Sequence, residues 1–304
     1  MTFRLVFMLL AAGLLAACAS NGRPAPARSP ALFVDCRGAP SASPTVILES
    51  GAFGSAADWD LLLDDLAKGG RVCAYDRAGI GRSPPRTGGP GVAAIALELK
   101  DLLDSLGESR PVILVGHSNG ALYIETFAAM WPDRVAGLVY VNGVNSDALD
   151  HPDLVRDLTV ERRWAIVAAL GGDVGLSGQV SDMLTGVSGF SGRAADRKRQ
   201  DLSDPDALRV ARDEDVAVID GLKVARGLGG SPRAIPTAVI AGSTDPDASL
   251  SKSWKVAEDA PALRARQRLI IDVPNATHTS PLGRDRGYVA TAVDWLRGTS
   301  RGLP

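Results

Sequence analysis

The chain has 304 residues, of which 45% are hydrophobic and 22% charged, and these proportions are typical of a globular protein rather than a disordered one. Its length suits one large α/β domain or two smaller ones. The formal net charge is −2 and the basic residues are scattered, which excludes the basic stripe of a nucleic-acid-binding protein.

The first segment has the layout of a secretory signal peptide. A short basic start precedes the apolar stretch Leu5–Ala17, which is too short to span a membrane. Leu15–Cys18 resembles the bacterial lipobox, in which cleavage precedes the cysteine and lipid is attached to its thiol. This resemblance implies a signal peptide at 1–17 and an exported lipoprotein, anchored through Cys18 to a membrane of the cell envelope. By the same resemblance, Ala19 rather than an aspartate after this cysteine favours the outer membrane, facing the periplasm. An ordinary signal peptide is the alternative.

Residues 18–31 are rich in Pro, Ala and Arg, and we expect them to form a flexible tether. Two cysteines follow, Cys36 and Cys73. Disulfides persist in exported proteins, so we expect these two to be bridged. Closing such a loop contributes about 3–4 kcal/mol of stability in the chain-entropy account. Two buried free thiols are the alternative.

Strands and helices then alternate along the chain. Apolar runs predict strands at 45–49, 71–75, 112–115, 135–141, 237–241 and 268–273. Amphipathic patterns predict helices at 59–68, 92–106, 121–130 and 288–297. Because strands that are apolar on both faces are typical of parallel sheets covered by helices, we expect an α/β fold with a mostly parallel central sheet and helices on both faces.

Residues 145–232 depart from this alternation. They contain helical patterns near 160–170 and 205–224 and no clear strand. We expect a helical cap inserted into a core formed by 32–144 and 233–304, since insertions of this kind commonly overhang a binding site. Several apolar side chains of the insertion are consistent with an acyl-binding pocket or with a small packed core: Trp164, Ile166, Leu170, Met183, Leu184 and Phe190.

The sequence VGHSNG places Ser118 between the 112–115 strand and the 121–130 helix. Gly116-x-Ser118-x-Gly120 in a strand–turn–helix context predicts a nucleophile elbow, in which glycines remove clashes at a sharp turn and the serine hydroxyl stands above the sheet. A serine needs a base to take its proton. His278 follows the last strand and fits this role. His117 adjoins the serine and is expected to support it, while His151 lies in the insertion.

The base needs an acid to fix its tautomer. Asp245 follows the 237–241 strand and precedes His278, so the order is serine, aspartate, histidine. Asp247 is the main alternative for the acid, and Asp147 is a weaker one. The tetrahedral oxyanion needs backbone N–H donors, and we expect them from Asn119 and from Ala52 in the Gly-rich segment after the first strand.

From about residue 32 to 298, the chain resembles the α/β-hydrolase superfamily. LESGAFGSAADW (48–59) resembles its oxyanion loop, with Ser-Gly where many members carry His-Gly, and RVCAYDRAGIGRS (71–83) resembles its DxRGxGxS segment. WPDRVAGLVYVNG (131–143) resembles the stretch after the elbow helix. The resemblance implies that the segments of Cys36 and Cys73 are adjacent strands. It also implies structural roles for Asp76 and Arg77.

These features predict a serine hydrolase that cleaves a small carboxylic ester through an acyl-enzyme, with no metal or organic cofactor. A prolyl-type aminopeptidase on the same fold is one alternative, in which an acidic pair drawn from Asp213, Glu214 and Asp215 would grip a free amine. A non-catalytic binding lipoprotein, or a structural lipoprotein of the envelope, is another, because fold does not fix function.

Overall fold

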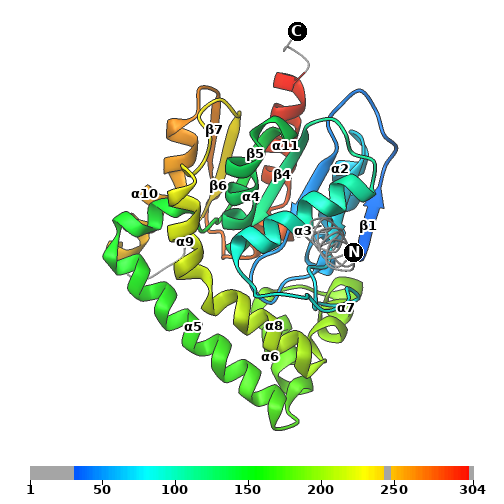
Figure 1. Ribbon diagram of the computed structural model, residues 1–304, viewed down its shortest axis with the longest axis vertical. Coiled ribbons are helices and arrows are strands. Elements are labelled where there is room, and N and C mark those ends of the chain that lie inside the picture. The colour runs from blue at the N-terminus through cyan, green and yellow to red at the C-terminus, as the bar shows by residue number, and fades with distance from the viewer. Residues whose placement is uncertain (1–30, 243–247, 301–304) are drawn as a thin grey trace, which may run out of the picture.

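The computed structural model describes residues 31–242 and 248–300, and its centre is a seven-stranded sheet in the order β1-β3-β2-β4-β5-β6-β7 (Figure 1). The edge strand β1 runs antiparallel to β3, and every other neighbouring pair is parallel, which confirms the predicted sheet. The strands are β1 (Val34–Arg37), β2 (Val46–Glu49), β3 (Val72–Tyr75), β4 (Val112–His117), β5 (Val135–Val141), β6 (Thr237–Ala241) and β7 (Arg268–Asp272).

Helices cover both faces of this sheet. Alternate strand residues point to opposite faces, so Leu48 packs with α2 and α11 while Ile47 packs with α3 and α4. The helices of the core are α2 (Asp60–Ala67), α3 (Val92–Ser105), α4 (Asn119–Met130), α10 (Ala248–Arg264) and α11 (Gly287–Ser300). The sequence did not predict α10, because its apolar residues do not gather on one face and it contains Pro261.

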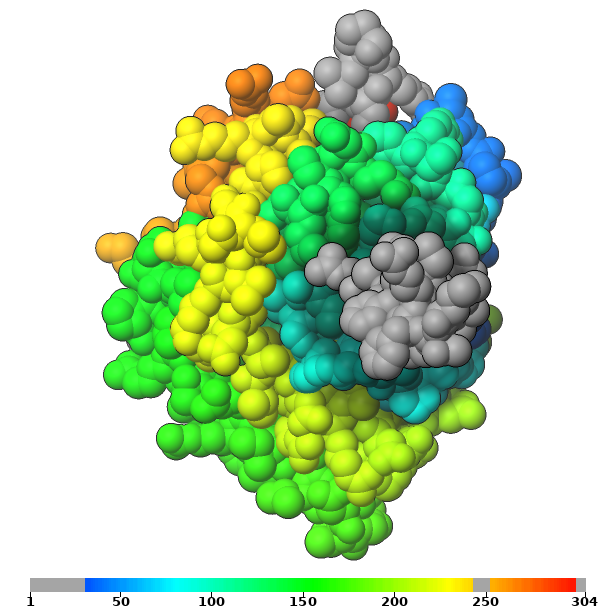
Figure 2. Space-filling model, in the orientation of Figure 1, coloured from blue at the N-terminus to red at the C-terminus, as the bar shows by residue number. Residues whose placement is uncertain are grey.

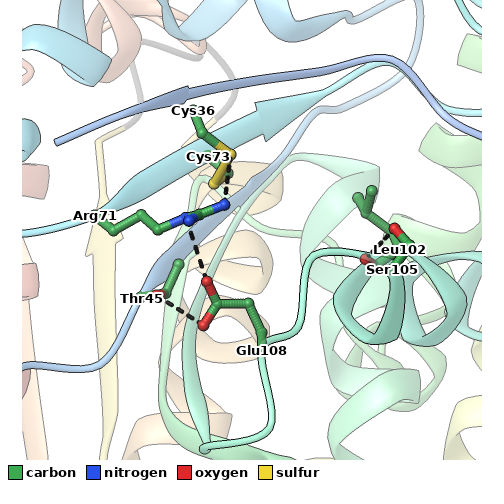
Figure 3. Close-up of a disulfide and its surroundings, with 7 residues drawn as sticks. All are labelled: Cys36, Thr45, Arg71, Cys73, Leu102, Ser105 and Glu108. Atoms are coloured by element: carbon green, nitrogen blue, oxygen red, sulfur yellow. Dashed lines mark hydrogen bonds and ion pairs between the residues drawn. A yellow bond between two sulfur atoms is a disulfide. The ribbon is translucent and has the colours of Figure 1, made fainter. Parts of the chain in front are cut away.

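A disulfide ties the edge strand β1 to the sheet. Cys36 and Cys73 are directly opposite each other in the β1–β3 ladder, with their Cα atoms 4.1 Å apart, and they are bonded (Figure 3). Nearby, Glu108 holds Arg71 at 3.3 Å and accepts a hydrogen bond of 3.0 Å from the hydroxyl of Thr45. The predicted bridge and the predicted adjacency of the two strands are both confirmed.

The segment between β5 and β6 consists of helices joined by turns and contains no strand. Its 3-10 turn η3 (Ser146–Asp150) is followed by α5 (Pro152–Asp173), α6 (Ser177–Ser188), α7 (Gly192–Leu202), α8 (Pro205–Val216) and α9 (Val218–Gly227). The expectation of one helix over 205–224 was wrong, because the chain breaks at Ala217. Figures 1 and 2 show the helices α5–α8 as a lobe at one end of the molecule.

This helical insertion lies over the carboxyl-terminal edge of the sheet. Asp201 of α7 accepts a hydrogen bond of 2.6 Å from Ser55, and Lys198 holds Asp58 at 2.8 Å. Ser55 and Asp58 belong to the connection that follows β2, where the strand ends. Ligands of open α/β sheets bind at this edge, so the insertion covers the expected position of a site. Among the described residues, no helix is long and apolar enough to cross a membrane.

Candidate active site

Ser118 occupies the turn between β4 and α4 with φ 53° and ψ −125°. This positive φ is rare for a residue with a side chain and marks a strained turn. A Cβ atom at Gly116 would lie 2.6 Å from the carbonyl oxygen of Gly120, and one at Gly120 would lie 2.4 Å from that of Glu49. Both glycines are therefore required sterically. Ser118 itself stays partly exposed at the end of the buried strand, as an elbow serine should.

His278 lies in the loop after β7, and its ring packs against that of His117 with centroids 4.8 Å apart. The backbone carbonyl of His278 accepts two hydrogen bonds, at 2.9 Å from Nε2 of His117 and at 2.8 Å from Nδ2 of Asn142. Burial lowers the pKa of His117 to about 3, so this imidazole is neutral and its Nε2 carries the proton that it donates. The structure thus brings His278 beside the elbow and gives His117 a supporting contact.

Asn142 follows β5 and was not singled out in the sequence. Its φ of 42° lies in the left-handed region, which asparagine tolerates better than most residues. While its Nδ2 holds His278, its Oδ1 accepts a hydrogen bond of 2.9 Å from the N–H of Gly242. Gly242 also lies against Ala276, since a Cβ atom on the glycine would be 2.4 Å from that of the alanine. The two loops that follow β6 and β7 are therefore joined through one amide.

Asp245 and Asp247 lie outside the described residues, so the choice between them stays a prediction. Gly242, the last described residue before them, lies next to the loop of His278. Asp147, the third candidate acid, is engaged elsewhere, because it pairs with Arg264 of α10 at 2.5 Å. His151 precedes the first residue of α5 and makes up its N-terminal boundary.

The loop after β2 lies directly against the elbow. A Cβ atom at Gly51 would be 2.8 Å from that of Ser118. The guanidinium of Arg77 donates to the carbonyl oxygens of Ser50 at 2.7 Å and Gly51 at 2.9 Å. Because N–H and C=O point in opposite directions across a trans peptide, the N–H of Ala52 points away from Arg77.

The backbone N–H of Ala52 and that of Asn119 remain available to a ligand. Within residues 31–242 and 248–300, neither group donates a hydrogen bond to another residue. Asn119 stands at the first position of α4, where helical N–H groups have no partner of their own and favour negative charge. Asn119 directly follows Ser118 in the chain, and Ala52 directly follows Gly51, which lies against Ser118.

Arg77 also connects the core to the insertion through buried ion pairs. It holds Glu49 of β2 at 2.9 Å and Glu214 of α8 at 2.9 Å, and Arg86 holds Glu214 from the other side at 3.0 Å. Burial raises the pKa of Glu49 to about 7, although Arg77 opposes this shift. Asp76, next along the chain, accepts from the N–H of Ala56 at 2.8 Å and that of Arg82 at 3.0 Å. Arg77 and Asp76 both hold loops in place, which is a structural role.

The acidic run of α8 separates into three environments. Glu214 is buried in the ion pairs with arginines, and Asp213 is exposed and pairs with Arg212. Asp215 alone reaches the elbow, where its Oδ1 accepts a hydrogen bond of 2.9 Å from the side chain of Asn119. Burial raises the pKa of Asp215. No sequence pattern predicted the contact between Asn119 and Asp215, because it joins residues far apart in the chain.

Most of the apolar side chains predicted to line an acyl pocket or to form a small core are not buried in either. Trp164, Ile166, Leu170 and Met183 are exposed, while Leu184 and Phe190 are half-buried. The reason is that α5 carries apolar residues on its outer face as well as on its packed face. Within the part of the chain that the structure describes, no group of three or more His, Cys, Asp or Glu side chains is placed to hold a metal ion.

Comparisons with known proteins agree with this architecture. RutD from Variovorax paradoxus, which is named as a proposed carbamate hydrolase, is 42% identical over 134 residues, covering 43% of this chain and 48% of that protein. The chain spans less than half the length of the curated relatives it matches.

Two solved esterases share the fold. A carboxylesterase structure from Nitrososphaera gargenis has a TM-score of 0.66 at 18% identity, over 92% of this chain and 98% of that one. A thermophilic esterase from Thermogutta terrifontis has a TM-score of 0.61 at 22% identity, over 88% and 93%. Identities this low establish the fold alone. A family model described as the alpha/beta hydrolase fold matches residues 44–282, and the chain therefore belongs to the α/β-hydrolase fold family.

Proposed function

We propose that the chain is a serine hydrolase that cleaves a carboxylic ester through an acyl-enzyme intermediate. The observation that carries this proposal is the position of a partly exposed Ser118 in a strained elbow, with the loop of His278 fixed beside it by His117 and Asn142. A strained turn flanked by two required glycines is costly for a purely structural serine. It is useful for a nucleophile that must stand clear of the sheet.

In the proposed mechanism, Oγ of Ser118 attacks the ester carbonyl while His278 takes its proton. The N–H groups of Ala52 and Asn119 bind the oxyanion of the tetrahedral intermediate, and each such donor is worth about 3–4 kcal/mol in comparable enzymes. His278 then protonates the leaving alkoxide. Water, deprotonated by His278, attacks the acyl-enzyme and releases the acid. Asp245 is proposed to hold the imidazole in the required tautomer.

The curated relative is consistent with attack on a carbonyl carbon. RutD is named for hydrolysis of a carbamate, which, like an ester, is attacked at such a carbon. An ester is the simplest substrate for this site, because the nucleophile, base and oxyanion donors suffice for it and no group dedicated to a peptide terminus is required.

The aminopeptidase alternative depends on acidic side chains that could bind an ammonium group. Of the three carboxylates predicted for this role, Glu214 and Asp213 are paired with arginines, and only Asp215 lies by the elbow. One carboxylate, already bound to an amide, is a weaker grip than a pair. Hydrolysis of L-prolyl p-nitroanilide by the protein, lost in Asp215→Asn while ester hydrolysis persists, would favour the aminopeptidase.

We further propose that the protein is a lipoprotein, anchored through Cys18 to the outer membrane and facing the periplasm. The support is the lipobox-like sequence at the end of the apolar stretch, and the disulfide, which suits an oxidising compartment. Cys18→Ala should allow alkaline washing to extract the protein from membranes, which the lipidated wild type should resist. A variant that stays with the membranes and is not extracted by alkaline washing would contradict the anchor.

A fluorophosphonate probe tests the hydrolase directly, because it reacts with activated serines. The wild-type chain should be labelled at Ser118, as read by mass spectrometry of its peptides, and Ser118→Ala should not be labelled. Ser105→Ala is the matched control, since Ser105 lies at the end of α3 and its hydroxyl donates to the carbonyl of Leu102. A folded wild-type protein that the probe leaves unmodified would favour the binding lipoprotein.

A further inference from the structure

The outer surface of the insertion carries an unusual concentration of exposed apolar side chains. On α5, at its end and on α6, nine large apolar residues are exposed, among them Trp164 at 70%, Val174 at 72% and Val187 at 76%. The set consists of Val160, Trp164, Ile166, Val167, Leu170, Val174, Leu176, Met183 and Val187, and we call it the apolar stripe. Other large exposed apolar residues are scattered over α2, α3, α9, α10 and α11. Contiguous exposure of this kind marks a contact surface.

The residues of the stripe lie on two helices that are in contact. Val160, Trp164, Val167 and Val174 recur at helical spacing on the face of α5 opposite its buried residues, which include Ala165 and Ala169. The two helices touch at the end of this face, since a Cβ atom at Gly171 would lie 2.8 Å from a methyl group of Val180 in α6. Figure 1 shows α5 along the outer edge of the lobe, with nothing else of the described chain packed outside it.

Two arginines accompany the stripe. Arg156 and Arg163 lie on the outer face of α5 between its apolar residues, and both are exposed. Neither forms an ion pair with any residue of the described ranges. An amphipathic surface with an exposed tryptophan and unpaired cations is complementary to a bilayer with anionic headgroups, where apolar side chains enter the acyl boundary and arginines meet phosphates.

The position at which the chain enters the fold also favours a bilayer as the partner of the stripe. Val34 at the start of β1 pairs with Tyr75 at the end of β3, so the chain enters the fold at the carboxyl-terminal edge of the sheet, where the insertion lies. Arg197 of α7 is 3.7 Å from Asp35, which places this entry beside the insertion. Residues 19–33 separate Val34 from the proposed anchor at Cys18. A chain of this length reaches on the order of 50 Å when extended.

The geometry points to the apolar stripe as a docking face for the surface of a lipid bilayer containing anionic phospholipid. This inference rests on the proposed hydrolase and anchor and extends them by naming the substrate class. The far end of α6 meets the active site, because the carbonyl oxygen of Ser188 accepts a hydrogen bond of 2.9 Å from Thr279, next to His278. A docked insertion would therefore present the site to acyl esters that reside in the bilayer.

Quenching of Trp164 by brominated lipid tests the docking. The full chain carrying Ser118→Ala, which cannot consume lipid in the proposed mechanism, is mixed with vesicles of phosphatidylethanolamine and phosphatidylglycerol brominated on their acyl chains. The emission of Trp164 is the difference between this chain and the same chain with Trp164→Phe. We expect this emission to shift to shorter wavelength and to lose most of its intensity on vesicles. Vesicles without phosphatidylglycerol should give less quenching at equal lipid.

Two double variants distinguish binding through the apolar stripe from nonspecific hydrophobic binding to vesicles. Val167→Ser with Val174→Ser should abolish the quenching of Trp164. Val256→Ser with Leu263→Ser, at equally apolar positions of α10 that are 50% and 57% exposed, should leave it intact. Circular dichroism and the unfolding midpoint report whether each double variant is folded. If a double variant does not fold, the comparison of the parent chain with its Trp164→Phe variant still decides whether Trp164 enters the bilayer.

Two results would overturn the inference. One is unquenched Trp164 in a chain that sediments with the vesicles. The other is a blue shift that needs no vesicles and grows with protein concentration, which would make the stripe an interface between two copies of the chain. Failure of the hydrolase proposal would be seen separately, as absent ester turnover in the wild-type chain, and would not alter the quenching.

Discussion

The side chain of Asn142 donates a hydrogen bond of 2.8 Å to the backbone carbonyl of His278. The same side chain accepts a hydrogen bond from the N–H of Gly242, so it joins the loop of the proposed base to the last described residue before the candidate acids. The carbonyl of His278 is fixed a second time by His117. The alignment of the proposed triad thus depends on contacts that lie outside the triad itself.

Asn142→Gly removes both side-chain hydrogen bonds and keeps a residue that tolerates the positive φ. We expect kcat/KM for an ester to fall by about 10- to 100-fold, mainly through kcat, because a small displacement of the base costs this much in other enzymes. Asn275→Gly is the matched control, since Asn275 also has a positive φ of 54° and, among the described residues, its side chain hydrogen-bonds to neither loop. Equal losses in the two variants would mean that loop flexibility, and not the amide of Asn142, was responsible.

The acid is identified by a pair of isosteric variants. Asp245→Asn should lower kcat by about 10⁴, because an asparagine stabilises the wrong tautomer of the base. Asp247→Asn should lower it far less, and steady-state kinetics with one ester measures both. The reverse order would assign the acid to Asp247, and two small effects would contradict an acid in this loop.

The acid limb of the pH profile should report His278. The pKa of His117 is about 3, so His117 does not titrate in the working range. Desolvation by neighbouring atoms lowers the pKa of His278 below its ordinary 6.5. A protonated His278 cannot accept the proton of Ser118, so kcat/KM should fall as the pH falls through this pKa.

A carboxylate beside His278 acts in the opposite direction and raises its pKa. Asp245→Asn should therefore move the acid limb to lower pH as well as reduce the plateau. Profiles of kcat/KM against pH for the wild type and the variant measure both effects. A limb that stays in place when the carboxylate is removed would show that Asp245 does not act on His278.

We expect Glu214 to contribute to the stability of the fold and not to catalysis. Glu214→Gln leaves the buried Arg77 with one carboxylate fewer and should lower the free energy of unfolding by about 3 kcal/mol. Asp213→Asn, at the neighbouring position, removes an exposed pair with Arg212 and should change it by less than about 0.5 kcal/mol. Urea denaturation measures both. Similar values for the two variants would show that the buried network contributes little.

The sequence predicted those parts of the site that depend on local sterics. Gly116 and Gly120 are needed because their neighbours approach within 2.6 and 2.4 Å of a Cβ position, and this requirement is visible as GxSxG after an apolar run. The pairing of Cys36 with Cys73 and the parallel strands were also predictable. Each follows from a short local pattern or from a resemblance that covers most of the chain.

Contacts between distant segments could not be predicted. Asn142 with His278 and Glu214 with Arg77 join residues that only the folded chain brings together, and no local pattern distinguishes these side chains from others. The insertion was predicted as helical, but its apolar residues were expected to face a pocket or a core. They face outward on α5 because that helix is apolar on two sides, and periodicity alone does not say which side packs.

The most direct measurement is the rate of p-nitrophenyl ester hydrolysis by the purified protein, with short and long acyl chains, beside Ser118→Ala. We predict turnover in the wild type, and in Ser118→Ala a loss of at least about 10⁴-fold with an unchanged unfolding midpoint. Turnover that survives in Ser118→Ala, or none on any ester from a folded wild-type protein, would contradict a serine esterase.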